Sequence, residues 1–205
     1  MAFRGYSELS RVAYNKHNER RPGAFDESNL VDKFNRRTYH SLKDLLADIR
    51  YILAHRSSLR EARRGGLVSY AFRERLMLVV TEINRCRYCS YFHAQEALKA
   101  GISKEELQDL LDGCIPEGSP EEEISALLYA QHWAENDAHP DPDAQRRLLE
   151  DYGKEKADAI QIILRVIRMG NLLGNTGDYW LYRLSFGRWG LLPKERSRVT
   201  PATGS

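Results

Sequence analysis

The chain has 205 residues, of which 42% are hydrophobic and 29% are charged, a composition typical of a globular protein with one sizeable core. The longest apolar run, residues 76–80, is far shorter than the roughly 18 residues of a membrane-spanning helix, so we expect no membrane partner. The first ten residues lack the basic start and apolar core of a secretory signal. Three cysteines are too few for a secreted disulfide framework, and the cytoplasm is therefore predicted.

The net charge of +2 is unevenly distributed along the chain. Residues 1–65 carry 14 Lys and Arg against 8 Asp and Glu, whereas the remaining residues carry 17 against 21. A basic segment can bind nucleic acid, but no aromatic pattern or recognition motif accompanies this one. We therefore expect no nucleic-acid partner and interpret the basic segment as a solvated surface or an arm on an acidic neighbouring subunit.

The first part of the chain divides at clear breaks in its apolar pattern. Residues 1–38 are polar and are predicted to form an N-terminal arm. Helical periodicity then predicts helices over residues 39–56 and 67–84, with a short basic segment and a Gly-Gly turn between them. The pair Asn84-Arg85 breaks the period, and a new helix is expected over residues 86–100.

The later helices are predicted from their capping sequences. Three such starts occur, at Ser103 with Glu106, at Ser119 with Pro120, and at Asp141 with Pro142. The third helix should end before Gly153, and from about residue 154 the sequence is helical and apolar on two faces, which is typical of a central or shared helix. No alternating strand pattern occurs, so we predict an all-α, single-domain fold over residues 39–190 and a flexible tail over residues 191–205.

Residues that can carry chemistry gather in the segment 74–93, ERLMLVVTEINRCRYCSYFH. In a helix that starts after Arg85, Cys86, Cys89 and His93 share an arc of about 60°, because each residue advances by about 100°. A helix N-terminus and a nearby imidazole both favour a thiolate, and a second cysteine can capture a sulfenic acid or mixed disulfide. The motif predicts thiol redox chemistry that needs neither a cofactor nor a metal.

Another class of function remains open on the same residues. Cys86, Cys89 and His93 could be three ligands of a zinc-stabilised binding module, with Cys114, Glu74 or Glu82 as the fourth. Three ligands crowded on one helical arc make tetrahedral closure awkward, however, and no second C-x-x-C or H-x-x-x-H follows.

The stretch RERLMLVVTEINRCRYCSYFHAQEALKAGIS resembles the carboxymuconolactone decarboxylase and AhpD-like alkylhydroperoxidase family over residues 67–112. Its signature is a glutamate followed by C-x-x-C-x-x-x-H. The resemblance implies an AhpD-like helical fold, trimers or hexamers of such subunits, and a peroxidase that takes electrons from an unidentified thiol or dithiol donor. It implies that Cys89 is the peroxidatic nucleophile, that Cys86 resolves, and that His93 and Glu74 relay protons through water. The alternative activity is that of a protein disulfide reductase of the same family.

The sequence departs from the family pattern at one position and leaves one role open. Tyr88 replaces a histidine that lies between the cysteines in the AhpD type, so it is a possible helper in the relay. Glu74 has the family spacing, but Glu82 lies only four residues before Cys86 and competes with it. We expect the two helices to pack antiparallel, with Glu74 beside His93 and Glu82 near the turn. Decarboxylase members lack the cysteine pair, which argues against lactone decarboxylation.

Small and polar residues recur in the last apolar helix. Gly170, Gly174 and Gly177 are expected to permit close packing of another helix. Asn171 and Asn175 lie on one face, either at a subunit contact or next to the site, and we prefer the subunit contact.

Overall fold

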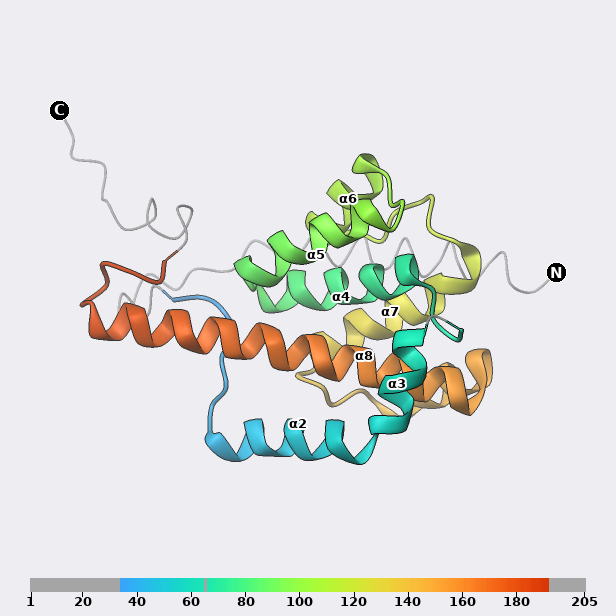
Figure 1. Cartoon of the computed structure of the whole chain (residues 1–205), viewed down its shortest axis with the longest axis horizontal. Helices are drawn as coiled ribbons and strands as arrows, with labels where there is room; N and C mark the ends of the chain where they lie inside the picture. The colour runs from blue at the N-terminus through green and yellow to red at the C-terminus, as the bar shows by residue number, and fades with distance from the viewer. Residues whose placement is uncertain (1–33, 65, 192–205) are drawn as a thin grey trace.

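The computed structural model describes residues 34–64 and 66–191 (Figure 1). Within these residues the protein is built from seven helices and contains no strand, which confirms the all-α fold. The helices are α2 (Leu42–Ala54), α3 (Arg56–Arg64), α4 (Tyr70–Asn84), α5 (Arg87–Lys99), α6 (Lys104–Leu111), α7 (Glu121–Glu135) and α8 (Pro142–Leu184). Most of the predicted arm and tail lies outside the described residues. The exceptions are residues 34–38, in which Phe34 and Arg36 are buried, and Leu191 of the tail, which is buried as well.

Helix α8 runs along the length of the molecule, with α4 and α5 on one side and α2 on the other (Figure 1). Its start is capped as predicted, since the Asp141 side chain accepts a hydrogen bond from the backbone N–H of Ala144. The helix is interrupted at Gly153 (φ 69°, ψ 166°), where the sequence predicted one helix to end and another to begin. A glycine suits this conformation because it has no Cβ to clash at positive φ.

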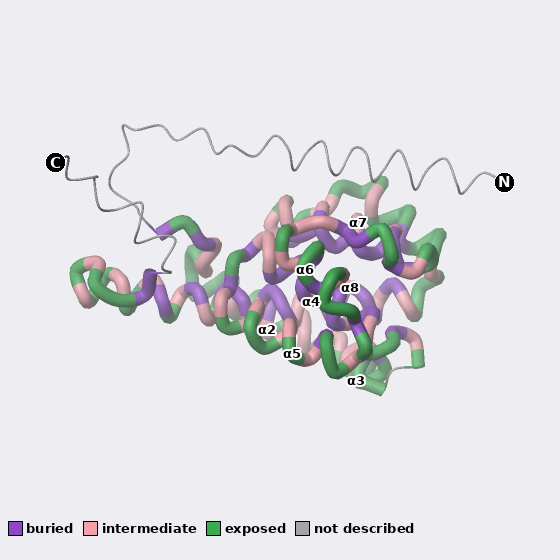
Figure 2. Tube along the Cα trace, turned by 90° about the horizontal axis from the view of Figure 1, so that it is seen from above, coloured by how far each residue is buried: buried purple, intermediate pink, exposed green. Residues whose placement is uncertain are grey.

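The core lies where α4, α7 and α8 meet, and buried residues gather along these helices in Figure 2. Of the two apolar faces that the sequence predicts from about residue 154, one is buried in this core through Ile160, Ile163, Leu164 and Ile167. The other face is buried at Ile162 but exposed at Leu173. Helix α8 is therefore central to a single subunit. Apart from Leu149 near its start, the exposed large apolar side chains of α8 lie from Leu173 onward.

The capping predictions differ in outcome. The Ser103 hydroxyl accepts a hydrogen bond from the N–H of Glu106, as the sequence predicted. The prediction for Ser119 is wrong, because α7 begins at Glu121 after Pro120, and no side chain caps it. Ser119 instead belongs to the preceding turn, in which its N–H donates to the carbonyl of Pro116. None of the helices in the described part of the chain is long and apolar enough to cross a membrane.

Candidate active site

The candidate site is built on the turn between α4 and α5, which pack side by side (Figure 1). Arg85 caps the end of α4, and its left-handed backbone (φ 58°, ψ 41°) directs its N–H to the carbonyls of Thr81 and Glu82. Cys86 follows as the N-cap of α5, and its sulfur accepts from the N–H of Cys89 at 3.4 Å. A sulfur thus occupies the position that Ser, Thr or Asp usually takes, at the positive end of the helix dipole.

The two thiols of this turn lie against each other. The Sγ atoms of Cys86 and Cys89 are 2.7 Å apart and share a hydrogen bond, and both cysteines are free. Because a disulfide bond is about 2.05 Å long, a small movement of the first turn of α5 would join them. Cys86 is 1% exposed and Cys89 is half-buried, so a substrate from solvent reaches Cys89 more readily.

The environment shifts the pKa values of the two thiols in opposite directions. The hydrogen bond from the Cys89 thiol is the main reason why the pKa of Cys86 is lowered to about 7, and the N–H groups of Cys89 and Tyr88 act in the same direction against the effect of burial. The pKa of Cys89 is raised, because it holds the proton shared with Cys86 and is itself partly buried. In the reduced pair, the thiolate therefore forms first on Cys86.

The predicted contact between Glu74 and His93 is observed. The antiparallel packing of α4 and α5 brings Oε2 of Glu74 to 2.7 Å from Nδ1 of His93. Glu74 is 2% exposed, and its other oxygen lies 3.4 Å from Nε of Arg73. Glu82 lies in the last turn of α4 and is half-buried. Of the two candidate carboxylates, Glu74 is the one that the structure joins to His93.

Tyr88, the possible helper, is joined to α8. It is 51% exposed, and its hydroxyl donates to Oδ1 of Asp178 at 2.8 Å and accepts from Nη2 of Arg87 at 2.6 Å. This hydroxyl is therefore engaged by a carboxylate and a guanidinium rather than held ready as a free proton donor.

Helix α8 lines the other side of the thiol pair. Asn171 is fully buried, donates from Nδ2 to the hydroxyl of Thr81 at 3.1 Å, and accepts at Oδ1 from the side chain of Asn84 at 3.2 Å. Its side-chain amide also acts to lower the pKa of both thiols. One turn further along, a Cβ added at Gly174 would lie 3.2 Å from the sulfur of Cys86.

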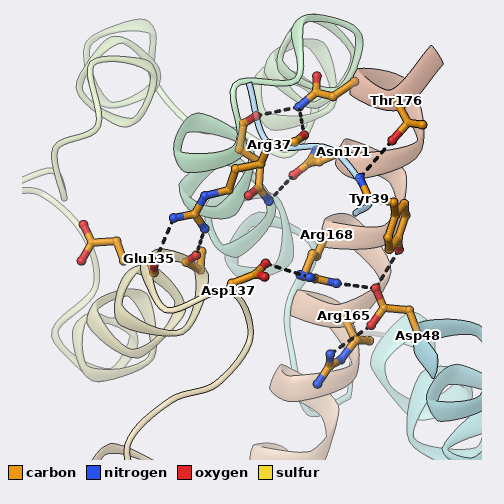
Figure 3. A network of polar contacts seen from close by, with 12 residues as sticks. Arg37, Tyr39, Asp48, Glu135, Asp137, Arg165, Arg168, Asn171 and Thr176 are labelled. Atoms are coloured by element: carbon orange, nitrogen blue, oxygen red, sulfur yellow. Dashed lines mark hydrogen bonds and ion pairs between the residues drawn. The ribbon is translucent and has the colours of Figure 1, made fainter. Parts of the chain in front are cut away.

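The preferred prediction for the two asparagines is therefore wrong. Asn171 and Asn175 are both 0% exposed within one chain, and Asn175 donates to the carbonyl of Asn84 at 2.7 Å. They belong to the site rather than to a subunit contact (Figure 3 shows Asn171 on α8). The signal in the sequence was their helical spacing together with Asp178, since three polar residues one turn apart in an apolar helix must meet polar partners.

A cavity of about 520 Å³ lies beside the turn but outside the thiol pair. Its walls come from residues 34–38 and His40, from Ile83 and Arg85 at the end of α4, and from Glu135 and Asp137 at and after the end of α7. Neither cysteine lines it, so it is not the place where a substrate would meet the thiols.

The described residues contain no group of three or more His, Cys, Asp or Glu side chains arranged to hold a metal ion. Because Nδ1 of His93 is engaged by Glu74 and the two sulfurs by each other, the structure gives no support to a zinc-stabilised module.

The fold and the site together define an all-α protein in which two paired thiols share a helix with a histidine that contacts the buried Glu74. Residues 50–132 match the carboxymuconolactone decarboxylase family, which confirms the resemblance found in the motif. The matched segment contains the six candidate residues Glu74, Glu82, Cys86, Tyr88, Cys89 and His93, whereas Asn171, Gly174 and Asp178 of α8 lie outside it. No curated protein and no solved structure matches the chain.

Proposed function

We propose that the protein is a cofactor-free, thiol-dependent peroxidase that reduces hydrogen peroxide or an organic hydroperoxide with electrons from a thiol or dithiol donor. The observation that carries this proposal is the pair of sulfurs 2.7 Å apart at the N-terminus of α5. One turn further along α5, His93 contacts the buried carboxylate of Glu74 on α4. The family match supports the same class of chemistry.

Cys89 is the proposed nucleophile because it is the more exposed sulfur. Its pKa is raised by Cys86 and by burial, so its proton has to be removed before it can attack. His93, four residues after Cys89, accepts this proton directly or through water, and Glu74 stabilises the imidazolium that forms. Attack of the Cys89 sulfur on the peroxide breaks the O–O bond and gives a sulfenic acid on Cys89 and a molecule of water or alcohol.

Cys86 then resolves the sulfenic acid. Its pKa of about 7 provides thiolate at neutral pH, and this thiolate attacks the sulfur of Cys89. The S–S bond forms and the S–O bond breaks. The oxygen leaves as hydroxide and becomes water by taking up the equivalent of the proton that Cys86 released when it ionised. An external dithiol returns the two electrons by thiol–disulfide exchange.

A protein disulfide reductase is the second candidate, and one observation favours it. Tyr88, Tyr91 and Phe92 are 51%, 72% and 57% exposed, so the helix that carries the more exposed thiol also carries exposed aromatic surface. Exposed aromatic side chains of this kind are typical of surfaces that contact another polypeptide. In this activity the oxidant would be a disulfide of a partner protein.

We also propose a homo-oligomer, a trimer or hexamer, located in the cytoplasm. Exposed apolar side chains on the last turns of α8 share one face at helical spacing, namely Leu173, Trp180, Leu181 and Leu184. A contiguous exposed apolar surface on a helix normally marks an interface. Three free cysteines suit a reducing compartment.

The proposed function is tested by single-turnover oxidation of the reduced protein with peroxide, followed by peptide mapping. We expect a reversible Cys86–Cys89 disulfide, with Cys114→Ser behaving as the unsubstituted protein. Cys86→Ser should accumulate a sulfenic acid on Cys89 that a dimedone probe traps, and Cys89→Ser should not react. A disulfide that involves Cys114, or full reactivity without Cys89, would contradict the proposal. Parallel assays with peroxide and with a model disulfide separate the two activities.

A further inference from the structure

Both residues between the two thiols are attached to a single carboxylate on α8. Asp178 is 1% exposed, and its Oδ1 accepts from Nη2 of Arg87 at 2.7 Å and from the hydroxyl of Tyr88 at 2.8 Å. Arg87 and Tyr88 also bond to each other, so the three side chains form a closed set. Asp178 thus fixes the short loop that a Cys86–Cys89 disulfide would close.

This carboxylate is itself fixed by the segments at both ends of the described chain. Its Oδ2 accepts from Nη1 of Arg36 at 2.5 Å, and the Arg36 side chain is fully buried. Arg36 also donates to the carbonyl of Gly190, which has a left-handed backbone (φ +82°). A Cβ at Gly190 would overlap the backbone oxygen of Asp178, so the chain after α8 closes directly over this residue. Asp178 is therefore a rigid anchor rather than a mobile surface acid.

We propose that Asp178 is a positioning residue that favours the Cys86–Cys89 disulfide and so sets the reduction potential of the thiol pair. The proposal rests on the proposed thiol–disulfide function, but it does not depend on peroxide being the oxidant. It concerns a residue outside the segment that matches the family.

Geometry gives the first reason. Anchoring Arg87 and Tyr88 holds the first turn of α5 in the conformation in which the two sulfurs are 2.7 Å apart. A fixed turn raises the effective concentration of one thiol at the other, because less conformational freedom is lost when the bond forms.

Charge gives the second reason, and it favours the disulfide in the same way as the geometry does. Asp178 neutralises Arg87, the residue next to Cys86, together with Arg36. Without this carboxylate, the two guanidinium groups would stabilise a thiolate on Cys86 and therefore the reduced form of the pair. A stabilised reduced form makes a disulfide more oxidising. Loss of the carboxylate should therefore weaken the disulfide through both effects.

The chain offers a matched control in Asp48 of α2. Asp48 is 3% exposed and also accepts from two arginines and one tyrosine: Arg165 at 3.0 Å, Arg168, and the hydroxyl of Tyr39 at 2.7 Å (Figure 3). These partners lie on α8 and before α2, and none belongs to α5. Asp48→Asn should thus cost a similar amount of folding stability without releasing the turn that carries the thiols.

The test compares Asp178→Asn with Asp48→Asn in the full-length chain carrying Cys114→Ser. Each protein is equilibrated with mixtures of oxidised and reduced glutathione, in which the dithiol loses two electrons and two protons and one glutathione disulfide becomes two glutathione thiols. The fraction oxidised is measured by thiol alkylation and mass spectrometry. We expect Asp178→Asn to lower the equilibrium constant for disulfide formation by about tenfold, equivalent to about 30 mV. Asp48→Asn should stay within about twofold.

Tyr88→Phe keeps the test valid if Asp178→Asn does not fold. It removes one hydrogen bond to Asp178 from a half-exposed side chain, and we expect a loss of about threefold. An equilibrium constant for disulfide formation that is unchanged in both Asp178→Asn and Tyr88→Phe would overturn the proposal. If Asp178→Asn does not fold, an unchanged constant in Tyr88→Phe alone would overturn it. An equal change in Asp48→Asn would overturn it as well. A protein that forms no disulfide in any mixture would overturn the proposed function as well. Disulfide formation without peroxide turnover, with the expected shift, would support the role of Asp178 and refute only the peroxidase.

Discussion

Replacing Glu74 by glutamine removes one charge from the proposed proton relay and little else. Glu74 is 2% exposed, and its Oε2 lies 2.7 Å from Nδ1 of His93. Glutamine has the same size and can still accept a hydrogen bond from the imidazole. When His93 takes the proton of Cys89, however, the imidazolium of the variant faces a neutral amide instead of a carboxylate.

The size of the effect follows from this geometry. Unit charges about 4 Å apart attract each other by about 4 kcal/mol at an effective dielectric constant of about 20. A neutral hydrogen bond of about 1 kcal/mol remains in the variant, so about 3 kcal/mol is lost. Because about 1.4 kcal/mol corresponds to a factor of ten in rate, Glu74→Gln should slow the oxidation of Cys89 by about 10²-fold. This value lies at the lower end of the range for loss of a general base.

The assay is single-turnover reduction of peroxide by the reduced protein, with Glu82→Gln as the control. Glu82 lies on the same helix and is half-buried in its last turn, so its substitution should change the rate by only a few-fold. The pKa of Cys89 should rise in Glu74→Gln and stay unchanged in Glu82→Gln. A slower reaction in Glu82→Gln than in Glu74→Gln would show that the relay is wrongly assigned, although the thiol pair could still be reactive.

Three further predictions follow from the same site and from α8. Gly174→Ala should slow disulfide formation at least tenfold, because its Cβ would lie 3.2 Å from the sulfur of Cys86. The control Gly170→Ala should not slow it, because a Cβ there would meet nothing within 4 Å. Equal rates of disulfide formation in the two variants would refute this close approach. Thiolate absorbance of the reduced protein should rise as the pH passes about 7, because the lowered pKa of Cys86 keeps its thiolate until the pH falls below that value. Cys86→Ser should lose this step. A first rise in thiolate absorbance only at pH 9 or above would contradict the prediction. Sedimentation at micromolar concentration should show an oligomer that Trp180→Glu dissociates, because a charge would then lie in the exposed apolar stripe of α8, and a monomeric unsubstituted protein would disprove the assembly.

The reactive half of the site could be predicted because it depends on local structure. A break at Asn84-Arg85 and two periodic segments on either side are enough to fold α4 back on α5. Glu74 and His93 lie at comparable distances from that break, so they meet once the two helices are antiparallel. The error at Ser119 has a local cause too, since a residue held in the preceding turn cannot also cap the helix.

The contribution of α8 could not be predicted in this way. A polar residue in an apolar helix indicates a buried partner, but its identity depends on how two distant helices pack. Asn171 could equally have paired across a subunit contact, and only the fold places it against Thr81 and Asn84. Gly174 was expected to permit close packing of a helix. The nearest atom to a Cβ built at this position is the sulfur of Cys86.

The two halves of the site therefore have separate tasks. Helices α4 and α5 supply the thiols and the relay that removes a proton from Cys89. Helix α8 acts on Cys86: Asn171 acts to lower its pKa, Gly174 leaves room for its sulfur, and Asp178 fixes the residues next to it. Because the two sets of residues lie on different helices, reaction with the oxidant and stability of the resulting disulfide can vary independently. Substitutions on α8 should then change the reduction potential more than the rate of the first step, and substitutions at Glu74 or His93 the reverse.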